Sequence, residues 1–259
     1  MTKKLDSLIP EFFELVKSSV DFSKYSTSYK ADGSPVTEVD LLINDLFFNF
    51  CKDNELNYPI ISEESFDNLS AKGVLESLPA FIIDPVDGTK DLIRGNGDWS
   101  ISIGFLNSTD IKDPLSRGWI YQPSRDKVFS SLKKSPDLAC DEAKDLNVLV
   151  SRTEFNDGLF DSLKDYGGFN IVPMGSIALK LAMLSSGECD LVITFRPKSL
   201  WDLAAGLVLS SRNHCYSFIG QTDRPITHFH GELTYKSPML FGNKASENRL
   251  ESIIKLLSR

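Results

Sequence analysis

Apolar residues recur at helical spacing in two stretches near the N-terminus. In residues 1–20 an apolar side chain returns every three or four positions, which predicts an amphipathic helix. The polar run KADGSPVTEVD, residues 30–40, is expected to form a loop. Helical spacing then resumes over residues 41–50, so a second helix is predicted that begins near Thr37 or Glu38.

Short apolar or alternating runs predict strands in the rest of the first half. Residues 58–62 and 81–83 are interpreted as buried strands, and each runs directly into acidic residues. Asp84 and Asp87 stand where the second of these strands is expected to stop. Three more strands, joined as an antiparallel meander, are predicted over 99–106, 117–121 and 127–132.

The second half alternates between strands and helices. Strands are predicted over 146–150, 170–172 and 189–195, and helices over 157–165, 175–186, 201–211 and 253–257. This alternation predicts an α/β layer packed beside the first half. The polar run over 135–145 is the predicted boundary between two halves, residues 1–145 and 146–259, of one compact unit.

Composition and charge narrow the functional class. The chain has 259 residues, of which 41% are hydrophobic and 25% charged, and its net charge is −8 without a Lys/Arg-rich block. These values are typical of a globular protein and argue against a nucleic-acid partner, which needs a basic surface. A small anionic ligand stays compatible, because cations at one site can outweigh the net charge.

The chain is expected to work in the cytoplasm, away from membranes. No apolar stretch is long enough to span a bilayer, and acidic residues interrupt the N-terminal apolar positions, unlike a secretory signal. The cysteines form no C-x-x-C pair and are typical of reduced, mostly packed thiols: Cys51, Cys140, Cys189 and Cys215.

Residues 81–89, FIIDPVDGT, carry the strongest chemical signal. Carboxylates at one strand end, here Asp84 and Asp87, repel each other and are costly to desolvate; Mg²⁺, which prefers hard oxygen ligands, removes both penalties. Gly88 and Thr89 follow at an expected helix start, where backbone N–H groups attract phosphate. The alternative is an Asx-type turn with a helix cap, which the same residues could form by themselves.

Two further acidic positions favour the metal site over this alternative. Glu63 and Glu64 directly follow the strand predicted over 58–62. Asp202 precedes the small residues 204–206, which let a helix start approach a neighbour closely. Alone, Asp202 is more typical of a helix N-cap. Three separate strand or loop ends that carry acids are harder to explain structurally, so they favour metal binding.

The order and spacing of these motifs resemble the inositol monophosphatase superfamily, a group of magnesium-dependent, lithium-sensitive phosphomonoesterases. The resemblance runs from residue 30 to residue 206 and includes residues 33–37 with Asp40, and residues 175–178. It implies an α/β (α+β) fold, the family's layered α/β/α/β/α sandwich. It also implies a homodimer and a hydrolase that needs no protein nucleophile.

The resemblance also implies roles for individual residues. Two to three Mg²⁺ ions would be held by Glu63, Asp84, Val86, Asp87 and Asp202. The attacking water would be oriented by Glu63, Thr89 and Asp40. The substrate, a small anionic phosphorylated metabolite, would contact Gly88, Thr89, Ser176, Ala178 and Lys180.

The substrate is predicted from two shorter motifs. DGTKDL at 87–92 and NGDW at 96–99 resemble the 3′(2′),5′-bisphosphate nucleotidases, which predicts conversion of 3′-phosphoadenosine 5′-phosphate to AMP and phosphate. The spacing of residues 175–187, with Ala178, instead resembles inositol- and histidinol-type phosphatases. Inositol 1-phosphate, histidinol phosphate and NADP are therefore alternative substrates. A metal-binding regulatory protein without turnover is the alternative outside this class.

For four more side chains the sequence does not decide whether they contact the substrate. Arg196 and Lys198 can reach substrate charge or stay in solvent. His228 and His230 form an H-x-H pair that can bind zinc, although a surface loop is the favoured interpretation.

Overall fold

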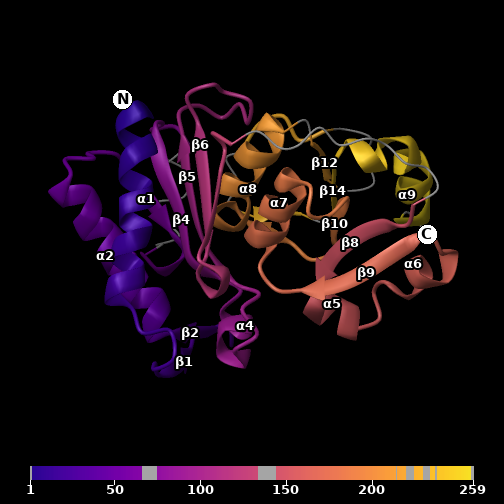
Figure 1. Ribbon diagram of the computed structural model, residues 1–259, viewed down its shortest axis with the longest axis horizontal. Coiled ribbons are helices and arrows are strands. Elements are labelled where there is room, and N and C mark those ends of the chain that lie inside the picture. The colour runs from indigo at the N-terminus through magenta and orange to yellow at the C-terminus, as the bar shows by residue number, and fades with distance from the viewer. Residues whose placement is uncertain are drawn as a thin grey trace.

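The computed structural model describes residues 2–65, 75–133, 144–213, 215–219, 225–229, 234–236 and 238–257. Most of the boundary predicted over 135–145 lies outside these ranges, as do Cys140 and His230. The described elements include two five-stranded sheets, with helices between them and on both outer sides (Figure 1).

The first sheet is built from the first half of the chain. Its strands, in spatial order, are β3 (Ile60–Ser62), β4 (Ala80–Asp87), β5 (Ser100–Leu106), β6 (Arg117–Gln122) and β7 (Lys127–Ser130). β3 and β4 are parallel and the other neighbours antiparallel, which confirms the predicted meander. Two helices, α1 (Thr2–Ser19) and α2 (Glu38–Asp53), pack on one face and bury Phe12 and Phe47 against Phe81 and Phe105. Both predicted N-terminal helices are therefore confirmed.

The second sheet is built from the second half. Its strands, in spatial order, are β12 (Tyr216–Ile219), β14 (Met239–Gly242), β10 (Leu191–Thr194), β8 (Leu146–Ser151) and β9 (Phe169–Met174). β8, β9 and β10 are parallel to one another. Helices α6 (Asp161–Tyr166) and α9 (Leu250–Leu257) cover its outer face, where Leu163 and Ile253 pack on Val148 and Val150.

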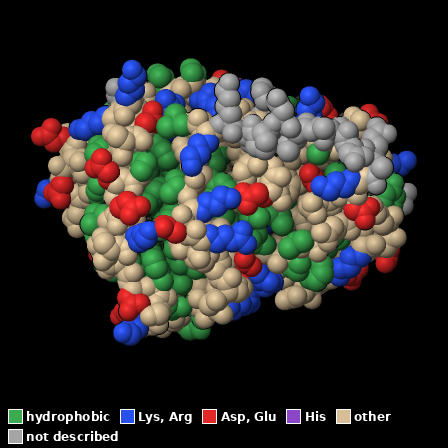
Figure 2. All heavy atoms as spheres, viewed as in Figure 1, with side chains coloured by type: hydrophobic (Ala, Val, Ile, Leu, Met, Phe, Trp, Pro, Cys, Tyr) green, Lys and Arg blue, Asp and Glu red, His purple; other side chains and the backbone are tan. Residues whose placement is uncertain are grey.

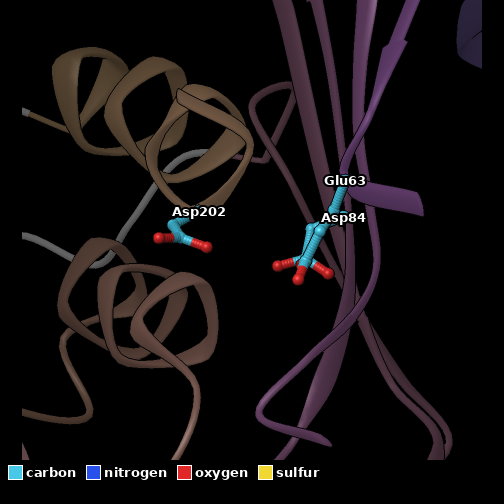
Figure 3. Close-up of side chains that lie close together, drawn as sticks. All are labelled: Glu63, Asp84 and Asp202. Carbon is cyan, nitrogen blue, oxygen red and sulfur yellow. The ribbon is translucent and has the colours of Figure 1, made fainter. Parts of the chain in front are cut away.

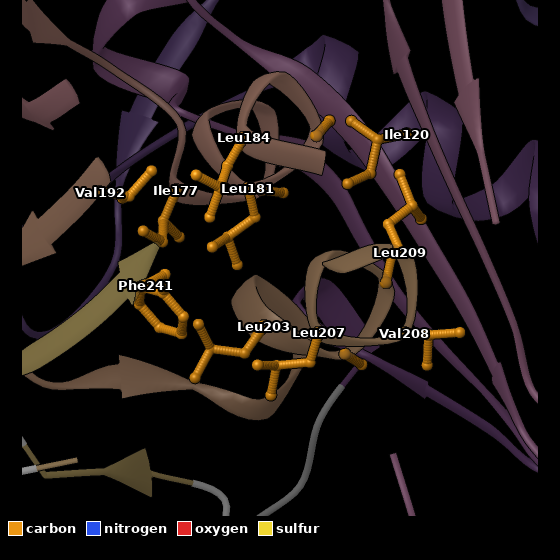
Figure 4. Close-up of a cluster of buried hydrophobic side chains, with 14 of the residues drawn as sticks. Ile120, Ile177, Leu181, Leu184, Val192, Leu203, Leu207, Val208, Leu209 and Phe241 are labelled. Carbon is orange, nitrogen blue, oxygen red and sulfur yellow. The ribbon is translucent and has the colours of Figure 1, made fainter. Parts of the chain in front are cut away.

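Two helices, α7 (Ile177–Ser186) and α8 (Leu200–Arg212), fill the space between the sheets (Figure 1). Their side chains meet Ile120 of the first sheet and Val192 and Phe241 of the second in one apolar cluster (Figure 4). Because both helices are covered on two sides, they are apolar almost all round rather than amphipathic. The order helix, sheet, helix, sheet, helix confirms the predicted layered sandwich.

Two predicted elements differ in the structure. The predicted loop over 30–40 is partly a hairpin, in which β1 (Thr27–Tyr29) pairs with β2 (Pro35–Thr37) across a turn that contains Gly33 at φ +81°. The helix predicted over 157–165 is shorter and begins later, as α6, and a separate helix that was not predicted, α5 (Arg152–Asn156), precedes it. Gly158, at φ +79°, interrupts the helical path between them.

The described surface carries mixed charge. Lys and Arg side chains gather near the centre of one face, with acidic side chains beside them (Figure 2). Among the described helices, none has the length and apolarity to cross a bilayer. Cys51, Cys189 and Cys215 are free thiols. His228 is exposed and bonds to the hydroxyl of neighbouring Thr227.

Candidate active site

A β-bulge in β4 brings Asp84 and Asp87 to the same site. Asp84 lies opposite Ser102 of β5 and Asp87 lies opposite Ser100, so three steps along β4 match two steps along β5. Side chains alternate between the faces of a regular strand, and residues three apart would point to opposite faces. The extra residue of the bulge corrects this alternation. The strand therefore does not stop at Asp84, as the sequence predicted, but continues to Asp87.

Asp84 also forms the local turn that was the alternative interpretation. Its Oδ1 accepts a hydrogen bond of 3.0 Å from the Val86 N–H, which is an Asx-type turn. The helix that follows, α4 (Thr89–Arg94), has Gly88 as its N-cap, and no side chain caps it. The Asx-type turn of the alternative is therefore present, the helix cap is Gly88 without a side-chain hydrogen bond, and both coexist with an acidic cluster.

Glu63 and Asp202 complete this acidic cluster from two other elements. One carboxylate oxygen each from Glu63, Asp84 and Asp202 lie within 4.8 Å of one another. Glu63 begins a 3₁₀ turn directly after β3, and β3 is parallel to β4, so both acids emerge at the same edge of the sheet. Asp202 faces them from the start of α8 (Figure 3).

Small residues let α8 come close enough to place Asp202 there. A Cβ on Gly118 of β6 would lie 2.5 Å from the Ala205 carbonyl oxygen, and one on Gly104 of β5 would lie 3.2 Å from Ala204 Cβ. The predicted close approach of residues 204–206 is thereby confirmed. Asp202 also occupies position N3 of a capping box whose N-cap is Ser199, and its Oδ2 accepts the Ser199 N–H at 2.7 Å.

Burial raises the pKa of every acid in the cluster. The pKa of Asp84 lies well above its ordinary range because of burial and then repulsion from Glu63. Burial and repulsion from Asp87 raise the pKa of Asp202 to about 7. Burial also raises the pKa of Glu63, although Lys30 Nζ, 2.8 Å from Glu63 Oε1, acts against the rise. The cluster concentrates more negative charge than its described neighbours neutralise, which is the condition that favours a bound cation.

Asp87 faces the start of α7 with one of its oxygens. Its Oδ2 accepts hydrogen bonds from the Ser176 hydroxyl at 2.7 Å and from the Ala178 N–H at 2.6 Å. Ser176 adopts φ +42°, an unusual conformation for a residue other than glycine, and its hydroxyl also caps α7. The predicted substrate contacts Ser176 and Ala178 thus hold Asp87, and Ala178 is not among the residues that line the cleft.

Thr89 lies beside the cluster, next to Asp40. The Thr89 hydroxyl is 3.1 Å from Asp40 Oδ1 and 3.1 Å from the Val86 carbonyl oxygen. Asp40 is buried behind the cleft, and its Oδ2 accepts the Thr37 N–H as part of the α2 capping box. Gly88, at φ +95°, brings the chain against the Ser176 backbone, where a Cβ would lie 3.1 Å from the Ser176 nitrogen.

The acidic cluster, Asp87, Gly88 and Thr89 share a cleft of about 260 Å³ that both sheets and both central helices line. The acids Glu63, Asp84, Asp87 and Asp202 line one part of it. Four cationic side chains also line it: Lys90, Arg152, Lys180 and Lys198. The cleft therefore combines an acidic region suited to cations with basic side chains suited to anions.

Arg152 is a cleft residue that the sequence interpretation missed. Its Nε donates to Asp91 Oδ1 at 3.0 Å and its guanidinium also pairs with Asp98. The signal was available: Ser151 and Arg152 follow the predicted strand over 146–150 just as Glu63 and Asp84 follow theirs. Polar residues at the carboxyl end of a buried strand mark sites in α/β proteins.

Of the other side chains considered as substrate contacts, some line the cleft and others lie at the surface. Lys180 is buried, donates to the Gly175 carbonyl at 2.8 Å, and has its pKa lowered to about 8 by burial. Lys198 lines the cleft, whereas Arg196 is exposed and pairs with Asp157. His228 does not line this cleft.

A model of the inositol monophosphatase family matches residues 5–211. The chain belongs to this family. As a member it is a phosphoric monoester hydrolase, and the resemblance inferred from the motifs is confirmed.

The curated relatives that resemble this chain are of two kinds, bisphosphate nucleotidases and inositol monophosphatases. The 3′(2′),5′-bisphosphate nucleotidase CysQ of Buchnera aphidicola subsp. Acyrthosiphon pisum is 30% identical over 193 residues, 70% of this chain and 69% of the relative. CysQ of Escherichia coli strain K12 is 27% identical over 186 residues, 68% of this chain and 73% of the relative. The human inositol monophosphatase 2 is 25% identical over 213 residues, 76% of this chain and 72% of the relative.

Solved structures of family members share the fold. An IMPase/NADP phosphatase complexed with NADP and Ca²⁺ superposes with a TM-score of 0.78 at 17% identity, covering 99% of this chain and 95% of that one. A lithium-soaked inhibitory complex of staphylococcal inositol monophosphatase-1 gives 0.77 at 16% identity, with the same coverage.

Proposed function

We propose that this family member is a magnesium-dependent phosphatase that converts 3′-phosphoadenosine 5′-phosphate to AMP and phosphate. The observation that carries the phosphatase chemistry is the meeting of Glu63, Asp84 and Asp202 in one cleft with the Thr89 hydroxyl. Carboxylates from three separate elements do not converge in a buried place without a compensating charge.

The donor set fits Mg²⁺. The clustered groups are hard oxygen donors, and their raised pKa values are lowered again by a nearby cation. Glu63, Asp84, Asp202, the Val86 carbonyl and the Asp87 oxygen that α7 does not use would hold two to three ions. When bound, Mg²⁺ supplies charge neutralisation and lowers the pKa of a coordinated water.

The residues of the chain orient the reactants. The Thr89 hydroxyl, together with Asp40 or Glu63, orients the attacking water toward the phosphorus. The N–H groups of Gly88 and Thr89, at the start of α4, bind the phosphate oxygens. Ser176 holds Asp87, so that the carboxylate keeps one direction while the other oxygen faces the cleft. Catalysis then rests on in-line positioning and charge neutralisation.

Two observations support a bisphosphate as substrate. The similar 3′(2′),5′-bisphosphate nucleotidases are 26–30% identical to this chain, against 25–26% for the similar inositol monophosphatases. The cleft also offers cations beyond those that one phosphate at the acidic cluster would need, because Arg152, Lys180 and Lys198 line it. A second phosphate on the substrate would pair with them.

A phosphate-release assay tests the proposal. The panel holds 3′-phosphoadenosine 5′-phosphate, inositol 1-phosphate, histidinol phosphate and NADP, each with Mg²⁺, with chelator and with lithium. We expect the highest kcat/KM for the bisphosphate, loss of activity with chelator, and inhibition by lithium. A higher kcat/KM for inositol 1-phosphate or NADP would overturn the substrate. The absence of phosphate release from every compound would favour a regulatory protein without turnover.

The proposal includes three properties of the whole protein. The two halves, residues 1–145 and 146–259, fold as one unit, with the first providing most metal ligands and the second completing the site. The protein works in the cytoplasm, where its free thiols stay reduced. It forms a homodimer, which sedimentation or light scattering tests.

A further inference from the structure

Glu154 is a fully buried carboxylate that lies outside the acidic cluster. It belongs to the first turn of α5 and has no exposed surface. Its Oε1 accepts the Thr194 hydroxyl at 2.7 Å and the Arg196 N–H at 3.2 Å, and its Oε2 accepts the Phe195 N–H at 2.8 Å. A buried charge with three donors from one short segment fixes that segment, because each donor would lose a partner if the segment moved.

The segment that Glu154 fixes leads directly to Lys198. It leaves the end of β10 and continues into β11 (Lys198–Ser199), where Lys198 pairs with Tyr235 of β13 (Thr234–Tyr235). The Lys198 backbone is thus held from two sides, by Glu154 upstream and by β13 alongside. Its side chain lines the cleft and is 18% exposed.

The Lys198 ammonium lies near Glu154 without donating a hydrogen bond to it. Its Nζ lies 3.7 Å from Glu154 Oε1, longer than a hydrogen bond, and in the described part of the chain Nζ makes no hydrogen bond. Lys180, by contrast, donates to the carbonyls of Met174 and Gly175. In the described part of the chain, Lys198 and Lys90 are therefore the cleft ammonium groups that keep their donors for a ligand, and Lys198 is the one that lies beside Glu154.

We propose that Lys198 is a specificity-determining residue that binds a second anionic group on the leaving-group side of the substrate, and that Glu154 is the residue that positions it. The inference rests on the proposed function, since it assumes that the reacting phosphate lies at the acidic cluster. Lys198 approaches this cluster from the side of Asp87 and Asp202, where its charge acts on both carboxylates. A ligand held there at one phosphate presents its remaining part to Lys198.

The test compares each bisphosphate with its own monophosphate. The pairs are 3′-phosphoadenosine 5′-phosphate with adenosine 3′-phosphate, and inositol 1,4-bisphosphate with inositol 1-phosphate. For each variant the readout is the ratio of kcat/KM within a pair, measured on one preparation. The fraction of folded enzyme cancels in this ratio, so a partly unfolded variant still gives an answer.

Lys198→Met removes the ammonium and keeps the length of the side chain. We expect the ratio to fall roughly 10-fold to 100-fold, the range of a hydrogen bond to a charged group, through a higher KM for the bisphosphate. Lys198→Arg should restore most of the ratio. Arg196→Met is the matched control, because it removes a cation from the same segment. The Arg196 guanidinium pairs with Asp157 outside the cleft, so this variant should leave the ratio unchanged.

Glu154→Gln keeps the shape of the side chain but loses the charge and one acceptor. The ratio should fall in the wild-type background and stay unchanged in the Lys198→Met background, because Glu154 acts through Lys198. Equal loss for both members of a pair in Lys198→Met would overturn the specificity role. A fall in the ratio in both backgrounds would overturn the positioning role. If the inositol pair is the better substrate but its ratio responds to Lys198, the nucleotide proposal fails and this one stands.

Discussion

The Thr89 hydroxyl lies 3.1 Å from Asp40 Oδ1, a contact that joins residues 49 positions apart in the chain. A hydroxyl has one proton to donate, and the Val86 carbonyl oxygen competes for it at 3.1 Å. Asp40 is fixed in turn by the α2 capping box. The hydroxyl is therefore held between two acceptors, which supports its proposed role in orienting a water.

Thr89→Val tests this arrangement, since it keeps the β-branched shape and the backbone N–H but removes the hydroxyl. We expect kcat to fall roughly 10²-fold to 10⁴-fold, the effect of losing a group that handles a proton, while KM changes little. Thr89→Ser should recover most of the rate. Wild-type kcat in Thr89→Val with a reduced melting temperature would mean that Thr89 only stabilises the turn.

The proposed assignment of metal ligands is tested by substitution at Asp84. Asp84→Asn keeps an acceptor for the Val86 N–H but removes the charge, and kcat/KM should fall by at least about 10²-fold. Asp190→Asn is the matched control, because Asp190 is also buried and accepts a backbone N–H, from Asn147 at 2.8 Å, but does not line the cleft. Similar losses in both variants would contradict the assignment of Asp84 to the metal.

The stability of the metal-free protein should depend on pH. Burial raises the pKa of Asp202 from 3.8 to about 7, so between these values the folded state binds more protons than the unfolded state. The free energy of unfolding therefore falls as pH rises from about 4 to about 7. We expect the melting temperature in chelator to fall over this range and Mg²⁺ to restore it at pH 8.

Asp202→Asn should remove part of this dependence. In chelator at pH 8 its melting temperature should exceed that of the wild type by at least about 2 °C, the shift that ~1 kcal/mol produces in a chain of this size. At pH 5 the two proteins should be alike. A variant that is less stable than the wild type at pH 8 would show that the capping hydrogen bond to Ser199 outweighs the repulsion.

The close approach of α8 to the first sheet predicts a graded pair of glycine variants. Gly118→Ala places a Cβ 2.5 Å from the Ala205 carbonyl oxygen, whereas Gly104→Ala places one 3.2 Å from Ala204 Cβ. Gly118→Ala should therefore lose more stability, about 1–3 kcal/mol for overpacking, and more activity, because α8 carries Asp202. Denaturant unfolding and kcat measure both effects, and the reverse order would contradict them.

The sequence by itself determined those features that local chemistry controls. Acids that follow apolar strands at Glu63 and Asp84 marked the edge of the sheet that carries the acidic cluster, because a buried strand leaves few other reasons for charge at its end. Helical spacing located α1 and α2, and alternation located the β5–β6–β7 meander. The end of the polar run near Thr37 and Glu38 marked the start of α2. Each of these signals lies within a few residues.

Only the tertiary structure decided which of these residues meet. The bulge that turns Asp87 to the side of Asp84 depends on pairing with Ser100 and Ser102 of another strand. Asp202 reaches them only because Gly104 and Gly118 let α8 approach. Arg152 and Glu154 were not predicted as site residues, and Lys198 stayed open between the cleft and solvent, because the surface that each side chain faces depends on the fold. Burial and the contacts of distant segments set those roles, and neither can be read from spacing along the chain.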